Sequence, residues 1–143
     1  MKVSFTEAEI NSLIERFEAR QLPKVEWTHE AHLIVAIWYV SKYSSEKALS
    51  IVRKNITAHN AAVGTPNTDD EGYHETITKF WLTVADSFIK SQETNSTCEL
   101  CNRFIASGIS KSSFPLLFYS EKALFSVKAR RVWVEPDKKL FDF

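Results

Sequence analysis

The segment from Trp27 to Val40 constrains the fold more than any other part of this chain. It begins Trp-Thr-His-Glu-Ala-His and continues into the most hydrophobic run of the sequence, Leu33–Val40. On a helix through Thr28–Tyr43, apolar side chains occupy two separate faces. A helix that is apolar on two sides is normally packed by neighbours all round. This segment is therefore predicted to be the central helix, with its two histidines where the core begins to open.

Composition limits the class of protein. The chain has 143 residues, of which 44% are apolar, with three glycines and four prolines. This profile is typical of one globular domain spanning residues 1–143. Lysine plus arginine equal aspartate plus glutamate at 18 each. Because the chain has no basic excess, we expect no nucleic-acid partner. The apolar runs are too short to span a membrane and the first residues show no signal-peptide pattern, so we expect no membrane partner and a cytoplasmic location.

The spacing of apolar residues predicts four further main helices. Their expected positions are from Thr6 to about Arg20, from Ser45 through Ile56, from Tyr73 through Phe88, and Cys98–Ser107. Thr6 and Glu9 form a capping-box pattern at the first of these helices. Thr28 is the expected N-cap of the central helix.

The last thirty residues have a less regular pattern. Phe114–Tyr119 and Ser120–Phe125 are expected to form short helices, since Pro115 and Ser120 suit first-turn positions. From Arg130 the chain is predicted to be an extended tail that wraps over the surface. The predicted fold is therefore all-α: a compact bundle of about five main helices with short helices and an extended C-terminal tail.

The two cysteines, Cys98 and Cys101, form a single CxxC pair. A thioredoxin-type redox motif would lie within a βαβ pattern, which does not surround this pair. A structural zinc site would normally need two more ligands at similar spacing, and the chain has no other cysteine. We therefore interpret both residues as reduced, partly buried thiols.

Four histidines lie between residues 29 and 74, namely His29, His32, His59 and His74. His29 and His32 are three residues apart, whereas the zinc-protease helix needs a spacing of four, so that function is rejected. Both rings could still reach one ion, with His74 as a third ligand. A divalent metal such as zinc held by His29, His32 and His74 is one hypothesis, and Glu75, Asp69 or Asp70 would complete the site. The alternative is that His29 and His32 hydrogen-bond to neighbouring hydroxyl and carbonyl groups.

A pocket is predicted between the second and fourth helices, roofed by the polar loop Asn60–Gly72. His74 and Thr78 share a face of the fourth helix, and a half-buried histidine there is suited to acid/base chemistry. Arg53 and Arg130 are candidates for binding an anionic group, because arginine offers a planar fork. The catalytic candidates are His29, His32, His74 and Glu75, and the ligand-binding candidates are Trp27, Arg53, Asn60, Tyr73, Thr78, Trp81 and Arg130.

Several motifs resemble an uncharacterised family of small bacterial all-helical proteins. The similar residues are Trp27-Thr28-His29 with His32-Leu33, Asn60, Gly64, Gly72-Tyr73-His74-Glu75-Thr76 with Thr78, and in the tail Tyr119-Ser120, Leu124-Phe125-Ser126, Ala129-Arg130 and Trp133-Val134-Glu135-Pro136-Asp137. The resemblance spans about residues 17–140. It implies that His29, His32 and His74 belong to one shared pattern, and no activity is established for the group.

Three functions fit these observations. The first is an enzyme that acts on a small molecule by acid/base chemistry in the histidine-lined pocket, with or without a metal. The second is a non-catalytic module that binds a small ligand in the same pocket. The third is a structural or partner-binding helical domain, in which the histidines only hold the core together. We expect a small-molecule ligand in the first two cases.

Overall fold

The computed structural model describes residues 4–143, and every regular element in that range is helical. The five main helices are α1 (Glu7–Glu18), α2 (His29–Lys42), α3 (Ser45–Ala62), α4 (Glu75–Lys90) and α5 (Thr97–Ala106). The short elements are the 3₁₀ helices η1 (Lys24–Glu26), η2 (Gly108–Ser110) and η3 (Phe114–Leu117), and the α-helices α6 (Glu121–Leu124) and α7 (Val127–Arg131). The predicted all-α class, with five main helices, is confirmed.

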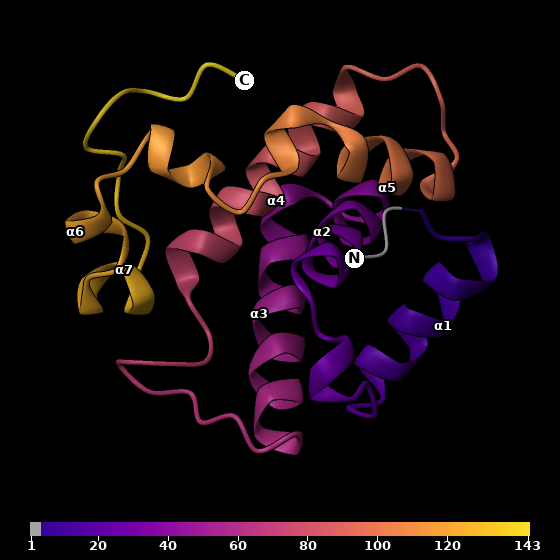
Figure 1. Cartoon of the computed structure of the whole chain (residues 1–143), viewed down its shortest axis with the longest axis horizontal. Helices are drawn as coiled ribbons and strands as arrows, with labels where there is room; N and C mark the ends of the chain where they lie inside the picture. Colours follow the sequence, from indigo (N-terminus) through magenta and orange to yellow (C-terminus); the bar gives the residue numbers. More distant parts are fainter. Residues whose placement is uncertain (1–3) are drawn as a thin grey trace.

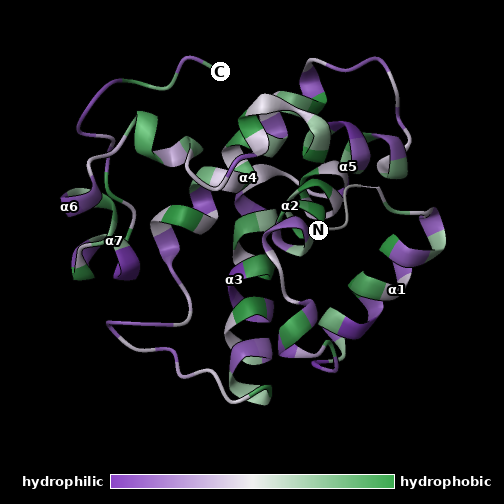
Figure 2. Ribbon diagram, viewed as in Figure 1, coloured by the Kyte–Doolittle hydropathy of each residue, from purple (hydrophilic) through white to green (hydrophobic). Residues whose placement is uncertain are grey.

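Helix α2 is the centre of the bundle, as its two apolar faces predict. It contacts each of the other four main helices, and Figure 1 shows it in the middle of the molecule. Leu33, Ile34 and Ile37 on α2 are each at most 2% exposed. Complete burial of one such side chain stabilises the fold by about 1.5–3 kcal/mol. Along α1 and α3, by contrast, hydrophobic and hydrophilic residues alternate (Figure 2), as expected for helices with one buried face.

Each main helix begins at a side chain that accepts a hydrogen bond from the first turn. These N-cap residues are Thr6, Thr28, Ser44, His74 and Ser96. The cap at His74 explains why α4 begins at Glu75 rather than at Tyr73 as predicted. At the other end of α1, Arg20 has a φ of 58°. This left-handed residue turns the chain, so α1 ends at Glu18, two residues before the predicted end.

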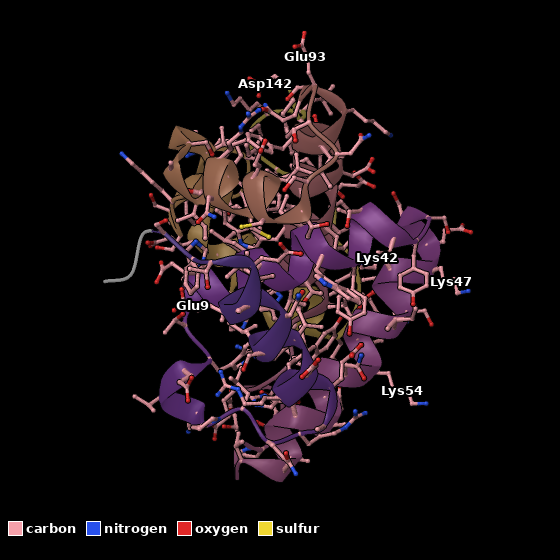
Figure 3. The ribbon with its side chains drawn as sticks, turned by 90° about the vertical axis from the view of Figure 1, so that its right-hand side faces the viewer. Glu9, Lys42, Lys47, Lys54, Glu93 and Asp142 are labelled. Atoms are coloured by element: carbon pink, nitrogen blue, oxygen red, sulfur yellow. The ribbon has the colours of Figure 1, made fainter. Side chains whose placement is uncertain are left out.

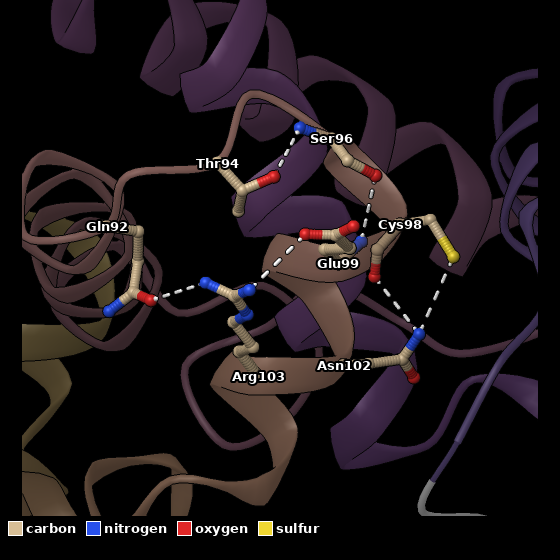
Figure 4. Close-up of polar contacts among 7 residues, drawn as sticks. All are labelled: Gln92, Thr94, Ser96, Cys98, Glu99, Asn102 and Arg103. Atoms are coloured by element: carbon tan, nitrogen blue, oxygen red, sulfur yellow. Dashed lines mark hydrogen bonds and ion pairs between the residues drawn. The ribbon is translucent and has the colours of Figure 1, made fainter.

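Helix α5 carries the CxxC pair and joins the N-terminal segment to the bundle. Figure 4 shows its first turn, where Ser96 caps the helix and the side-chain amide of Asn102 contacts Cys98. The same amide donates to Phe5 O at 2.8 Å. Both cysteines are free, and burial raises the pKa of the Cys101 thiol to about 12. The prediction of unpaired, at least partly buried thiols is confirmed.

The C-terminal segment differs from the prediction at its start. Arg130 belongs to α7, so the extended tail begins only at Val132. The Asp137 carboxylate accepts hydrogen bonds from Ser120 N at 2.7 Å and Ser120 Oγ at 2.6 Å. The backbone N of Lys138 donates to Phe118 O at 2.9 Å. The tail is thus fixed to the segment between η3 and α6 by polar contacts.

An aromatic cluster holds the end of the tail. The ring of Phe141 lies 5.5 Å from that of Phe80 on α4 and 5.3 Å from that of Phe118. The ring of Phe143 lies 5.8 Å and 5.4 Å from the same two rings. Phe80 and Phe118 are completely buried. The tail therefore completes the core instead of lying free in solvent.

The surface is rich in charged side chains of both signs. Figure 3 labels several of them, and the side chains of Lys54 and Glu93 extend away from the bundle. Within residues 4–143, no helix combines the length and the apolarity that crossing a membrane requires.

We predict that Phe141→Ala lowers the free energy of unfolding by about 2 kcal/mol, because it leaves a gap beside two buried rings. Leu140→Ala is the matched control: Leu140 is the neighbouring residue and is 81% exposed, so its loss should change stability by less than about 0.5 kcal/mol. Urea unfolding of both variants measures the difference. Equal stability of the two variants would show that the end of the tail does not contribute to the core.

Candidate functional site

Most of the predicted site residues line one of two cavities. The first, which we call the arginine cleft, has a volume of about 570 Å³ and is lined by Arg53, Thr57, Asn67, Thr68, Asp69, Tyr73, Glu75, Arg130, Arg131, Val132 and Trp133. The second, the His32 pocket, has a volume of about 50 Å³ and is lined by Trp27, His32, Val35, Ala36, Val52, Ile56, Ile77, Thr78, Trp81 and Leu82. The His32 pocket lies between α2, α3 and α4, close to the predicted position.

Eight of the predicted residues line these two cavities. Arg53, Tyr73, Glu75 and Arg130 line the arginine cleft, and Trp27, His32, Thr78 and Trp81 line the His32 pocket. His29, Asn60 and His74 line neither. The loop predicted to roof a single pocket contributes residues 67–69 to the arginine cleft instead.

His74 has a structural role at the start of α4. Its Nδ1 accepts a hydrogen bond from Ile77 N at 3.1 Å, and its Nε2–H donates to Leu124 O at 2.8 Å. The residue is 7% exposed. Burial lowers the pKa of His74. The bond to Leu124 partly offsets this effect, and the nearby Arg130 charge adds a smaller lowering. The neutral ring therefore caps α4 and joins it to α6, with both nitrogens occupied.

His29 and Asn60 also connect segments of the fold. The Nε2–H of His29 donates to Ser110 O at 2.6 Å, and its ring lies 5.3 Å from that of Trp81. This bond ties the first turn of α2 to η2. The side-chain amide of Asn60, which is 6% exposed, donates to Asn67 Oδ1 at 3.1 Å. The contact of His29 matches the alternative interpretation, in which His29 and His32 hydrogen-bond to neighbouring hydroxyl and carbonyl groups.

The structure therefore does not support the predicted metal centre on His29, His32 and His74. Among residues 4–143, no group of three or more His, Cys, Asp or Glu side chains could hold a metal ion together. The physical reason is that backbone carbonyls take the ring N–H groups first. His74 uses both nitrogens and His29 uses Nε2. A zinc site needs at least three convergent donors, which these rings do not provide.

Glu75 and Arg53 form a closed pair in the arginine cleft. Arg53 donates through Nε to Oε1 at 2.9 Å and through Nη2 to Oε2 at 2.7 Å, and Tyr73 OH donates to Oε1 at 2.6 Å. Burial alone would raise the pKa of Glu75, but the bonds from Arg53 and Tyr73 outweigh it and hold this pKa below its usual range. Burial, reinforced by Glu75, raises the pKa of Tyr73. At neutral pH Glu75 is thus a carboxylate that neutralises Arg53.

The two arginines of α7 have different partners. Arg131 donates through Nε and Nη2 to the Asp69 carboxylate, both at 2.7 Å. This pair joins α7 to the loop between α3 and α4, which lies beside it in Figure 1. Arg130 donates only through Nη1, to Gly72 O at 3.0 Å and Tyr73 O at 3.4 Å. Within residues 4–143 it has no carboxylate partner, and its Nε–Nη2 edge makes no hydrogen bond.

The loop that carries Asp69 is fixed by Asn67. Asn67 Oδ1 accepts from Tyr73 N at 3.0 Å as well as from Asn60, and Asn67 Nδ2 donates to Thr57 O at 3.0 Å. Gly72 closes the loop at a φ of +85°, where a Cβ would lie 2.3 Å from Pro66 O. Asn67, like Arg131 and Trp133, was not among the predicted site residues, and Asp69 was predicted only as a further metal ligand. The length of the polar loop Asn60–Gly72 was the signal that could have identified Asn67.

His32 is the one predicted histidine that lines a cavity. Its Nδ1–H donates to Thr28 O at 2.6 Å, and its ring lies 3.7 Å from that of Trp27. Burial lowers the pKa of His32 to about 4, although the bond to Thr28 opposes this change. The ring is therefore neutral at physiological pH. Its Nε2 makes no hydrogen bond within the described part of the chain.

His59, which was not among the predicted site residues, lies beneath the same tryptophan. It is completely buried, and its Nε2–H donates to Leu22 O at 2.8 Å. Its ring lies 5.3 Å from that of Trp27 and 5.5 Å from that of Phe17. This bond joins the end of α3 to the turn after α1.

Comparison with protein-family models, with curated proteins and with solved structures finds no match to this chain. The resemblance of its motifs to the bacterial helical family therefore stays a prediction.

Replacing His74 should affect stability strongly. His74→Ala removes the cap of α4 and leaves Leu124 O without its buried donor, so we expect a loss of about 2–4 kcal/mol in unfolding free energy. His74→Asn can still cap the helix and should lose less. Chemical denaturation measures both variants. If His74→Ala were as stable as the wild type, the structural role of this ring would be refuted.

Stability should also depend on pH through His32 and His74. The folded state lowers both pKa values, so below the usual histidine value of about 6.5 the unfolded chain binds more protons. The free energy of unfolding should therefore fall as pH drops from 7 to 5, by up to about 1 kcal/mol per pH unit for each histidine. Urea titrations at several pH values measure this slope. The slope should be shallower in His74→Asn, and an unchanged slope would contradict the assignment.

Proposed function

We propose that this protein binds a small molecule through one anionic group, which Arg130 holds in the arginine cleft. The observation that carries the proposal is the contrast among three arginines. Arg53 and Arg131 each use their Nε–Nη2 edge to bind a carboxylate of the chain. The same edge of Arg130 is open, while its Nη1 is fixed by two backbone carbonyls.

The charge of the cleft favours a monoanion. Its lining contains three guanidinium groups and two carboxylates, Asp69 and Glu75, which leaves one positive charge in excess. A carboxylate can accept two parallel hydrogen bonds from the open edge of Arg130. A group with two or more negative charges would exceed the available positive charge and would face Asp69 and Glu75. The preferred ligand class is therefore a small carboxylic acid.

The size and the walls of the cleft suit a small molecule. A volume of about 570 Å³ lies within the usual range for small-ligand sites. Val132 and Trp133 supply apolar surface beside the charged groups. Trp133 is half-buried and is held by Tyr119 and by a hydrogen bond from Nε1 to Glu135 at 2.9 Å.

Binding without catalysis is favoured over acid/base catalysis. A general acid or base works best with a pKa near the working pH. In the cleft, Glu75 is held as a carboxylate and the pKa of Tyr73 is raised above its usual value. His74, the nearest predicted acid/base residue, has both ring nitrogens occupied. The proposal therefore keeps the small-ligand module that the sequence suggested and replaces its histidine site with an arginine site.

The proposal can be tested by titrating the protein with acetate and benzoate at constant ionic strength while following arginine Nε–H resonances by NMR. Arg130 should shift saturably, whereas Arg53 and Arg131, which already hold carboxylates, should shift little. Arg130→Lys keeps the charge but loses the fork, and should weaken binding about tenfold or more. Arg103→Gln removes an exposed arginine of α5 that pairs with Glu99 and should leave binding unchanged.

Two results would overturn the proposal. The first is an Arg130 resonance that does not respond to either carboxylate at concentrations well above 10 mM. The second is an equal loss of binding in Arg130→Lys and Arg103→Gln, which would indicate only general charge attraction. Sulfate and phosphate at matched ionic strength test the ligand class, and tighter binding of either dianion would contradict the preference for a monoanion.

A further inference from the structure

The His32 pocket offers one hydrogen-bond acceptor in an apolar setting. The carbonyl of Thr28 can only accept, so the 2.6 Å contact fixes the proton on His32 Nδ1. Nε2 consequently carries a lone pair. Among residues 4–143, the only buried side-chain nitrogen or oxygen without a partner is Nδ1 of His59. His32 Nε2 is therefore accessible from outside the protein and can accept a hydrogen bond from a bound molecule.

We propose that the His32 pocket is a second binding site, specific for a small neutral hydroxyl group that donates a hydrogen bond to His32 Nε2. Thr28 O occupies Nδ1, so Nε2 is the ring nitrogen left to accept a hydrogen bond from a ligand. The ring cannot turn over without losing this bond. Its ring packs against that of Trp27, with the two centroids 3.7 Å apart and the planes tilted by 30°.

The lining selects against charge. Eight of the ten lining residues are apolar, and Thr78 is the only polar one besides His32. A charged ligand would lose its hydration without gaining a partner of opposite charge. A neutral donor loses much less and gains a hydrogen bond in an environment of low polarity. Because burial keeps the ring unprotonated down to a pH of about 4, the acceptor is present at every physiological pH.

The volume limits the size of the ligand. A volume of about 50 Å³ exceeds the roughly 10–15 Å³ that one water molecule needs. It is about a third of the roughly 150 Å³ of a cavity that holds benzene, so an aromatic ring does not fit. The space suits a hydroxyl group with one or two carbons, either as a free alcohol or as the end of a longer molecule. This site has no residue in common with the arginine cleft and does not depend on it.

The experiment compares ethanol with acetonitrile, which is of similar size but has no hydroxyl donor. We expect ethanol to shift the ¹⁵N resonance of His32 Nε2 and the methyl resonances of Val35 and Ile77 saturably. Acetonitrile should leave Nε2 unshifted. Arg130→Lys, which weakens the proposed carboxylate site, should respond to ethanol as the wild type does, so the two proposals can fail separately.

Two variants separate the pocket from the acceptor. Ala36→Val narrows the pocket while keeping the His32 acceptor and should weaken the ethanol response at least fivefold, whereas Ala106→Val, exposed at the end of α5, should not. His32→Leu removes the acceptor and should weaken the methyl shifts by a similar factor. If Ala36→Val fails to fold, Val52→Ile and His32→Leu decide the question. Equal shifts with ethanol and acetonitrile would overturn the proposal, as would an unweakened response in the folded variants. The absence of any saturable shift would also overturn it, because it would mean that water alone occupies the pocket.

Discussion

The burial of α2 on all sides is the constraint on which the rest of the structure depends. Because every neighbouring main helix packs against it, the polar groups at its N-terminal end cannot all reach bulk water. His29 and His32 resolve this locally, by donating to Ser110 O and Thr28 O. These bonds fix the turn that carries Trp27, whose ring then packs between His32 and Phe17. The histidines that mark this segment in the sequence are therefore first of all connectors between a buried helix and the segments around it.

This role explains what the sequence could and could not predict. Apolar periodicity located all five main helices, because a helix with one or two buried faces carries apolar residues at regular intervals along the sequence. The partners of the histidines could not be predicted, because they are backbone carbonyls such as Leu124 O, 50 residues from His74. Every residue carries a carbonyl, so no pattern of residue types marks the one that a folded chain brings near. Reasoning from side chains alone therefore assigned to a metal site the nitrogens that the backbone uses.

The arginine cleft shows the same limit for charged residues. Arg130 and Arg131 are adjacent in the sequence, yet one binds a carboxylate 62 residues away and the other binds two carbonyls. The difference arises because neighbouring residues on a short helix point in different directions. Arg131 faces the loop and meets Asp69, while Arg130 faces the chain just before α4. Sequence reasoning selected Arg130 because a guanidinium can donate two parallel hydrogen bonds. The geometry of α7 explains why its Nε–Nη2 edge has no partner within residues 4–143.

Arg130 also connects the cleft to the cap of α4. Its positive charge contributes to the lowered pKa of His74, and its Nη1 contacts the carbonyls of the two residues that precede that histidine. An anion bound at the open edge of Arg130 would offset part of this repulsion and raise the pKa of His74. Protonation of His74 would in turn remove the acceptor that caps Ile77 N. The guanidinium that we propose as the anion site thus also helps to keep His74 neutral, and so supports the cap at the start of α4.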